Sequence, residues 1–82
     1  MRLDKFLKVS RIIKRRTIAN DACDAGRVLV NGKAARASYD VKVGDVLELQ
    51  MGAKPFKAEI TEVKEHVTKD GAETLFKLIT NS

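Results

Sequence analysis

The sequence predicts an α+β fold in which two N-terminal helices pack on a small, curled, mostly antiparallel β-sheet. Three observations lead to this prediction. Apolar residues recur at helical spacing in residues 2–25 and alternate at strand spacing later in the chain, and an Asn31-Gly32 pair separates two short apolar or mixed segments. The chain has 82 residues, a length that fits one small domain with a modest core. We therefore expect a single domain over residues 1–82.

The first helix is predicted over residues 2–9, where Leu3, Phe6 and Leu7 form one apolar stripe. Asp4 lies in its first turn, where a carboxylate favours the helix dipole or caps free N–H groups. A basic connection follows this helix, with two isoleucines as expected core anchors.

The second helix is predicted over residues 17–25. Gly26 follows it, where a glycine supplies a left-handed backbone without steric penalty. We expect its buried stripe to consist of Ile18, Ala19, Ala22 and Cys23. The small alanines of this stripe allow the two helices to approach each other closely.

Five strands are expected after the helices. They are predicted at residues 28–30, 33–36, 46–51, 56–60 and 74–80, with the hairpin turn at 31–32 and a second turn, beside one helical turn, near 69–71. Phe56 and Phe76 are expected in the core, Tyr39 in the core or at its rim, and His66 at the surface.

The charge is distributed unevenly. The chain has 16 Lys and Arg against 11 Asp and Glu, for a net charge of +5. Residues 1–36 hold ten bases and three acids, and all six arginines lie among them, whereas residues 37–82 hold six lysines and eight acids. Because arginine forms bidentate contacts with phosphate, this segregation predicts a face that binds a polyanion. The alternative is chance clustering in a small basic protein.

The sequence shows no motif for a catalytic, cofactor-binding or membrane-spanning role. The single histidine, His66, is far in sequence from the single cysteine, and no metal-binding or nucleotide-binding motif is present. No apolar run is long enough to span a membrane, and the N-terminus does not read as a signal peptide. We therefore expect a cytoplasmic protein that is not an enzyme and that carries no cofactor or metal.

A dense series of residues carries a resemblance to a known family. It runs through Arg2-Leu3-Asp4-Lys5-Phe6-Leu7, Arg16, Ala19, Gly26-Arg27-Val28, Val30-Asn31-Gly32-Lys33, Ser38, Asp40-Val41 and Val43-Gly44-Asp45. In this order and spacing, residues 2–50 resemble the S4-like RNA-binding domain, the αL motif, and residues 51–82 form a C-terminal β extension. The resemblance implies RNA binding through the two helices and the loop that follows.

The resemblance also implies which residues bind RNA. Arg2, Lys5, Arg16 and Arg27 fall on the expected RNA-facing side, and the expected helpers are Lys8, Arg11, Lys14, Arg15, Asn20, Asn31 and Lys33. Asp4 is expected to organise the local polar network. Arg15 stands where family members often have a capping Ser or Thr, so the cap is lost at roughly 1 kcal/mol, and a phosphate could substitute for it.

Simpler interpretations exist for several of these residues. Lys5 and Lys8 could form a solvated helix face, and Arg16 could only neutralise the acids of its own helix, Asp21 and Asp24. For Asn31, a role in the hairpin turn competes with a role in RNA binding.

A more specific resemblance rests on the opening run Met-Arg-Leu-Asp-Lys-Phe-Leu-Lys-Val-Ser-Arg and on Lys14-Arg15-Arg16-Thr17. In these residues and in its length, the chain resembles the stand-alone S4-type proteins of the RqcP (YabO-like) family, which are related to the small heat-shock S4 proteins. This similarity implies a monomer that binds the obstructed large (50S) ribosomal subunit and contacts ribosomal RNA and the P-site peptidyl-tRNA. It also implies support for alanine tailing of stalled chains by an RqcH-type factor. The alternatives are an RNA-binding accessory subunit of an RNA-modifying enzyme and a heat-shock-type large-subunit recycling factor. A DNA-binding helix-turn-helix protein is disfavoured, because its second helix would bring Asp21 and Asp24 to the major groove.

Overall fold

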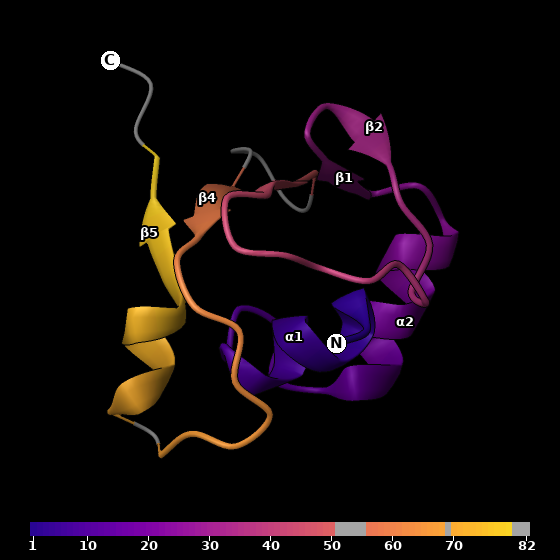
Figure 1. The fold of residues 1–82 in the computed structure, drawn as a ribbon. Helices are drawn as coiled ribbons and strands as arrows, with labels where there is room; N and C mark the ends of the chain where they lie inside the picture. Colours follow the sequence, from indigo (N-terminus) through magenta and orange to yellow (C-terminus); the bar gives the residue numbers. More distant parts are fainter. Residues whose placement is uncertain (51–55, 69, 80–82) are drawn as a thin grey trace.

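A computed structural model describes residues 1–50, 56–68 and 70–79 of the protein (Figure 1). Two helices come first in the chain, and strands follow them. The elements are α1 (Leu3–Val9), α2 (Arg16–Asp24), β1 (Val28–Val30), β2 (Lys33–Ala34), β3 (Val46–Leu49), β4 (Phe56–Ile60), the 3-10 helix η1 (Gly71–Leu75) and β5 (Phe76–Leu78).

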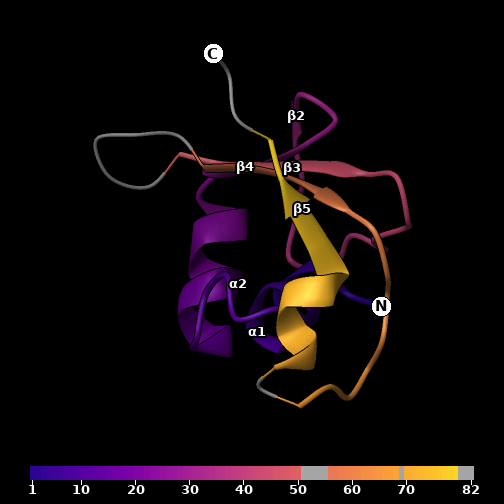
Figure 2. The ribbon, with the colours of Figure 1, turned by 90° about the vertical axis from the view of Figure 1, so that its left-hand side faces the viewer.

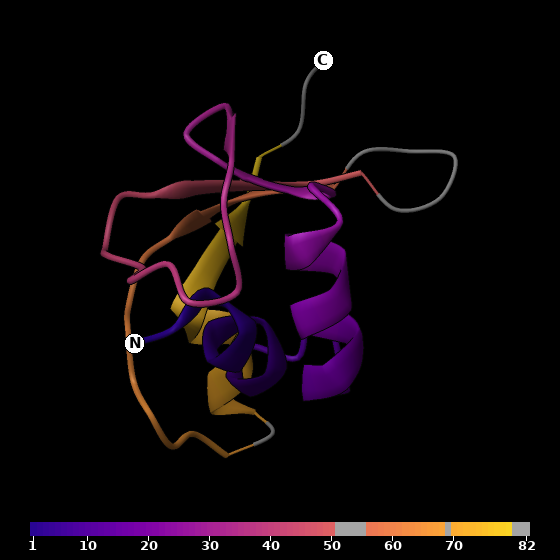
Figure 3. The ribbon, with the colours of Figure 1, turned by 90° about the vertical axis from the view of Figure 1, so that its right-hand side faces the viewer.

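The strands form one five-stranded sheet in the order β2-β1-β3-β4-β5, and every neighbouring pair is antiparallel. Both α-helices and η1 lie on one side of the sheet, with α1 next to α2 (Figures 1 and 2). Figure 3 shows the molecule from the side opposite to that of Figure 2. In this view the sheet lies above α2, and the chain leaves the end of α2 directly into the sheet. This arrangement confirms the predicted fold class.

The core lies between α1 and the sheet. Leu3, Phe6 and Leu7 are fully buried on α1, which confirms the predicted apolar stripe. Leu47 and Leu75 face them from β3 and η1 and are equally buried. Because full burial of such a side chain contributes about 1.5–3 kcal/mol, this cluster stabilises the packing of α1 beneath the sheet.

The hairpin between β1 and β2 turns at Asn31 and Gly32, as the sequence predicted. Both residues have positive φ angles, 53° and 85°, which is the backbone of a type I′ turn. The Asn31 side chain also holds the turn to β3. Its Nδ2 donates to Asp45 Oδ1 at 3.0 Å, and its Oδ1 accepts the Val46 N–H at 3.0 Å.

The C-terminal end of α2 is closed by Gly26, which has a φ of 77°. The Gly26 N–H donates to the Cys23 carbonyl at 3.0 Å and the Arg27 N–H donates to the Ala22 carbonyl at 2.9 Å. These two bonds are the Schellman pattern, which confirms the expected role of Gly26.

The structure corrects several expectations about α2 and the early strands. Ile18 was expected in the buried stripe but is 43% exposed, because α2 packs on α1 through a narrow face of Ala19, Ala22 and Cys23. The helix begins one residue earlier than predicted, at Arg16. The return strand stops at Ala34 and does not reach residue 36.

The last segment also differs from the prediction. Thr74 and Leu75 belong to η1 and not to the strand, and the Thr74 hydroxyl donates to the Gly71 carbonyl at 2.7 Å within this helical turn. Phe56 and Phe76 are half-buried against the core and meet edge to face, with ring centroids 6.1 Å apart. The expected ends of two strands, at residues 51 and 80, lie outside the described residues.

Candidate nucleic-acid interface

A buried carboxylate stands at the centre of the basic surface. The Asp4 side chain is only 3% exposed, and both of its oxygens accept hydrogen bonds. Oδ1 accepts from Arg2 Nε at 3.2 Å and from the Lys5 N–H at 2.8 Å. Oδ2 accepts from Arg16 Nε and from Asn20 Nδ2, both at 3.3 Å. Asp4 therefore organises the polar network that joins the starts of α1 and α2.

The environment keeps Asp4 ionised. Burial by itself would raise the pKa of its carboxyl group, since it disfavours the charged form. The hydrogen bonds from the Arg2, Asn20 and Arg16 side chains and from one backbone N–H outweigh burial, so the pKa lies below its ordinary value. At neutral pH the Asp4 carboxylate thus faces the guanidinium groups of Arg2 and Arg16.

The two arginines remain available to a ligand. Their side chains are 51% (Arg2) and 49% (Arg16) exposed, and each is tied to Asp4 through Nε. Because Nε is only one of the guanidinium donors, the terminal nitrogens are left for further hydrogen bonds. The hollow they border has a volume of about 420 Å³ and is lined by Arg2, Asp4, Arg16, Thr17, Asn20 and Asp21.

The start of α2 lies beside this hollow. Arg15 occupies the N-cap position in extended conformation and makes no side-chain cap hydrogen bond, which confirms that the cap is lost. The N–H groups of the first turn of α2 therefore receive no hydrogen bond acceptor from a capping side chain. They can donate to a ligand, and phosphate oxygens are common acceptors at helix N-termini. Arg16 forms its ion pair with Asp4, not with the acids of its own helix.

A second group of predicted residues lies around the C-terminal end of α1. Lys8, Arg11 and Lys14 line a hollow together with residues 65–68 of the C-terminal segment. Lys5 lies between the two groups, and its Nζ is 3.7 Å from Glu65 Oε1. Sequence reasoning did not bring residues 65–68 to this surface, because more than fifty residues separate them from α1.

The remaining predicted residues lie toward the sheet. Arg27 is exposed just after α2 and borders a small hollow with Ile18. Lys33 is exposed in β2. Asn31 is exposed, but both ends of its amide are engaged by the turn described above.

Cys23, Tyr39 and His66 lie where the sequence predicted them, in the core, at its rim and at the surface. Cys23 is buried, and burial, with the charges of Asp4 and Asp24, raises the pKa of its thiol to about 11. The Tyr39 hydroxyl donates to Asp45 Oδ2 at 3.1 Å at the rim of the core. His66 is exposed. Within the described ranges, no helix is long and apolar enough to cross a bilayer.

Comparison with known proteins identifies relatives over nearly the whole chain. Residues 1–47 match the S4 domain. The RQC P-site tRNA stabilizing factor of Halalkalibacterium halodurans is 55% identical over 78 residues, which cover 95% of this chain and 89% of the relative. The factor of the same name from Bacillus subtilis is 47% identical over 79 residues, which cover 96% of this chain and 92% of the relative.

Two solved structures share the fold. The trimeric structure of Vibrio cholerae heat shock protein 15 matches with a TM-score of 0.89 and 28% identity, and the match covers 96% of this chain and 81% of that one. The solution structure of hypothetical protein HP1423 matches with a TM-score of 0.83 and 32% identity, and the match covers both chains completely.

Proposed function

Because the chain belongs to the family of RQC P-site tRNA stabilizing factors, we propose that it is an RNA-binding factor of ribosome-associated quality control. It binds the obstructed large (50S) ribosomal subunit, where it contacts ribosomal RNA and the P-site peptidyl-tRNA together. It acts by binding and not by catalysis, it works in the cytoplasm as a monomer, and it supports an RqcH-type factor that adds an alanine tail to the stalled chain.

The observation that carries this proposal is the pair of arginines held by Asp4. A long, solvated arginine loses side-chain entropy when it binds a ligand. Here Nε of Arg2 and Nε of Arg16 are already hydrogen-bonded to one buried carboxylate, so the two guanidinium groups are oriented before RNA arrives. Such preorganised groups suit recognition of RNA shape and backbone, because phosphate contacts determine position.

The remaining basic residues widen this surface. In the proposed complex, Arg2, Lys5, Arg16 and Arg27 contact RNA phosphates, with support from Lys8, Arg11, Lys14, Arg15, Asn20, Asn31 and Lys33. The open first turn of α2 accepts a phosphate where Arg15 leaves the cap vacant. Since the contacts are mainly electrostatic, affinity should fall steeply as the salt concentration rises.

The test compares binding to purified 50S subunits with and without a P-site tRNA, using fluorescently labelled protein at several KCl concentrations. Arg16→Ala should weaken binding to the tRNA-bearing subunit about 10- to 100-fold, the range expected for lost hydrogen bonds to a charged group. Lys77→Ala is the charge-matched control, since Lys77 is exposed on β5.

Thermal unfolding of each variant shows whether the fold is retained. A wild-type protein that binds no better to tRNA-bearing subunits than to empty ones contradicts the proposed preference. If Arg16→Ala and Lys77→Ala bind equally well, the arginine pair is not the recognition element. A protein partner that stays bound after nuclease treatment would favour the accessory-subunit alternative.

A further inference from the structure

Both α-helices are followed by a residue with a left-handed backbone, but the two residues differ. In α2 the left-handed position after the cap is Gly26, whereas in α1 it is Arg11, with a φ of 64°. The Arg11 N–H donates to the Lys8 carbonyl at 3.0 Å, and the Ile13 N–H donates to the Leu7 carbonyl at 3.1 Å. Because a side chain with a Cβ is strained in this conformation, glycine would be the more stable choice for folding.

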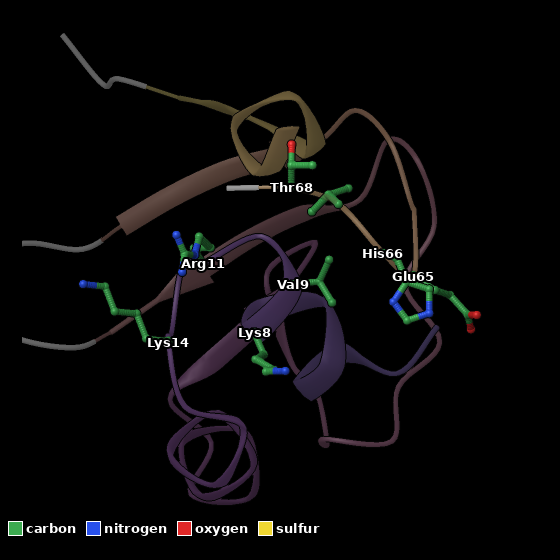
Figure 4. A pocket seen from close by; sticks show the side chains of 8 residues that line it. Lys8, Val9, Arg11, Lys14, Glu65, His66 and Thr68 are labelled. Carbon is green, nitrogen blue, oxygen red and sulfur yellow. The ribbon is translucent and has the colours of Figure 1, made fainter. Parts of the chain in front are cut away.

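The strained residue borders the hollow at the end of α1. This hollow has a volume of about 300 Å³ and is lined by Lys8, Val9, Arg11, Lys14, Glu65, His66, Val67 and Thr68. Figure 4 shows Arg11 and Lys14 on one side, His66 and Glu65 on the other, and Lys8 between them. Two segments far apart in the sequence thus form one site, and we name it the α1 groove.

The α1 groove is strongly positive. In the part of the chain that the structure describes, Lys8, Arg11 and Lys14 form no ion pair. Among the described lining residues, Glu65 carries a carboxylate, and its Oε1 is 3.7 Å from Lys5 Nζ. Because Lys5 lies outside the lining, it offsets part of the negative charge of Glu65 without adding to the cations of the groove. Three cations therefore share a small hollow with little internal compensation, which favours an anionic ligand.

The C-terminal segment adds a neutral donor to these cations. Thr68 lines the groove, but its Oγ1 accepts the Gly71 N–H at 3.2 Å and is turned toward η1 (Figure 4). The exposed His66 ring carries at least one N–H. A tetrahedral phosphate, with its several acceptor oxygens, matches such a mixed set of charged and neutral donors.

We propose that the α1 groove binds a backbone phosphate of RNA and that residues 65–68 of the C-terminal half form one wall of this site. This inference rests on the proposed function, and it adds a second anchoring point to the Arg2–Arg16 surface. Both points lie along α1, since Arg2, Lys5 and Lys8 follow one another at three-residue intervals over about 9 Å of helix. Strain at Arg11 then has a functional reason, because a glycine at this position would supply no side chain to the groove.

The decisive variant is Arg11→Gly, because stability and affinity should change in opposite directions. Glycine accepts a φ of 64° without strain, so the urea midpoint should rise. Binding to tRNA-bearing 50S subunits should weaken about tenfold, and the slope of log affinity against log salt should become shallower by about one unit, as for one lost phosphate contact. A purely structural arginine would change stability and leave affinity and salt slope unchanged.

Two further variants test the wall of the groove. Glu65→Gln removes the negative charge that the described residues contribute to the lining and should strengthen binding several-fold, whereas His66→Ala should weaken it. Lys42→Ala is the control for general loss of positive charge, since Lys42 is exposed and lies outside the groove. Wild-type affinity in Arg11→Gly and in Glu65→Gln would overturn the proposal.

The same titrations separate this inference from the proposed function. If the wild-type protein binds tRNA-bearing subunits and Arg16→Ala weakens binding while the groove variants do not, only the groove proposal fails. If the wild-type protein does not bind these subunits, the proposed function fails and the groove proposal fails with it.

Discussion

Replacement of Asp4 by asparagine should destabilise the protein more than any other single isosteric change in the basic half. Each carboxylate oxygen of Asp4 accepts hydrogen bonds from an arginine and from one further donor. In asparagine one of these oxygens becomes an NH2 group, which must then face donors and not acceptors. The side chain is 3% exposed, and water cannot easily separate the two donors. The shape of the side chain is retained, so the change isolates its charge and acceptor capacity.

The magnitude follows from the bonds that are lost. The ion pairs to Arg2 and Arg16 contribute about 1 kcal/mol each, below the range of roughly 1.5–3 kcal/mol for charged hydrogen bonds, because both arginines are half-exposed and screened by solvent. The donor facing the new amide nitrogen adds roughly 1 kcal/mol. We expect Asp4→Asn to lower the free energy of unfolding by about 2–3 kcal/mol at pH 7.

This difference should depend on pH with a defined sign. The pKa of Asp4 is lower in the folded protein than its ordinary value, so the folded state favours the ionised form. That contribution to stability is fully present above the unfolded pKa, near 3.9, and is lost as the pH falls through the folded pKa. The gap between wild type and Asp4→Asn should therefore be constant from pH 7 to about pH 5 and shrink below it.

The assay is urea unfolding followed by circular dichroism at a series of pH values. Asp21→Asn is the matched control, because Asp21 is exposed on α2 next to the same hollow and should change stability by less than about 0.5 kcal/mol. An Asp4→Asn protein as stable as the control at pH 7, or a gap that widens in acid, would refute the reasoning.

Three further predictions concern stability. Arg15→Ser should raise the free energy of unfolding by about 1 kcal/mol, because a serine in this extended N-cap position can accept an N–H of the first turn; an unchanged urea midpoint would contradict it. Asn31→Ala should lower stability by about 2 kcal/mol, since it removes two hydrogen bonds and strains a φ of 53°, and salt-dependent RNA titration will show whether affinity also changes. Leu47→Ala should lower stability by roughly 3 kcal/mol through a cavity in the core, measured by the same unfolding assay, and a loss below 1 kcal/mol would contradict full burial.

Local signals in the sequence were sufficient for most of the fold. Periodicity located α1 and its buried stripe, and the turn residues located the hairpin and the end of α2, because each of these features depends on residues close together in the chain. Ile18 was misplaced because its exposure depends on how much of α2 the neighbouring elements cover. At the boundary between η1 and β5 the Thr74 hydroxyl bonds back to the Gly71 carbonyl, a local alternative to strand pairing that the pattern of apolar residues does not reveal.

The candidate site was only partly predictable for the same reason. The types of residue and the segregation of arginine were visible, and Asp4 was expected to organise polar neighbours. Its pairing with Arg16 and Asn20 depends on the angle at which α2 meets α1. The approach of residues 65–68 to α1 depends on the path of the C-terminal segment, which carries no motif of its own.

The attachment of the chain's first residues to the segment before β3 has a consequence for the newly made protein. The Leu3 N–H donates to the Tyr39 carbonyl, and the Val41 N–H donates to the Met1 carbonyl. These backbone bonds make Arg2 and Asp40 the partners of an isolated antiparallel β-bridge. These bonds cannot form until residue 41 has been synthesised, about 2 to 8 s after residue 3 at 5–20 residues per second. The start of α1, and with it the position of Arg2, is therefore fixed only after the segment before β3 has been made and can pair with it.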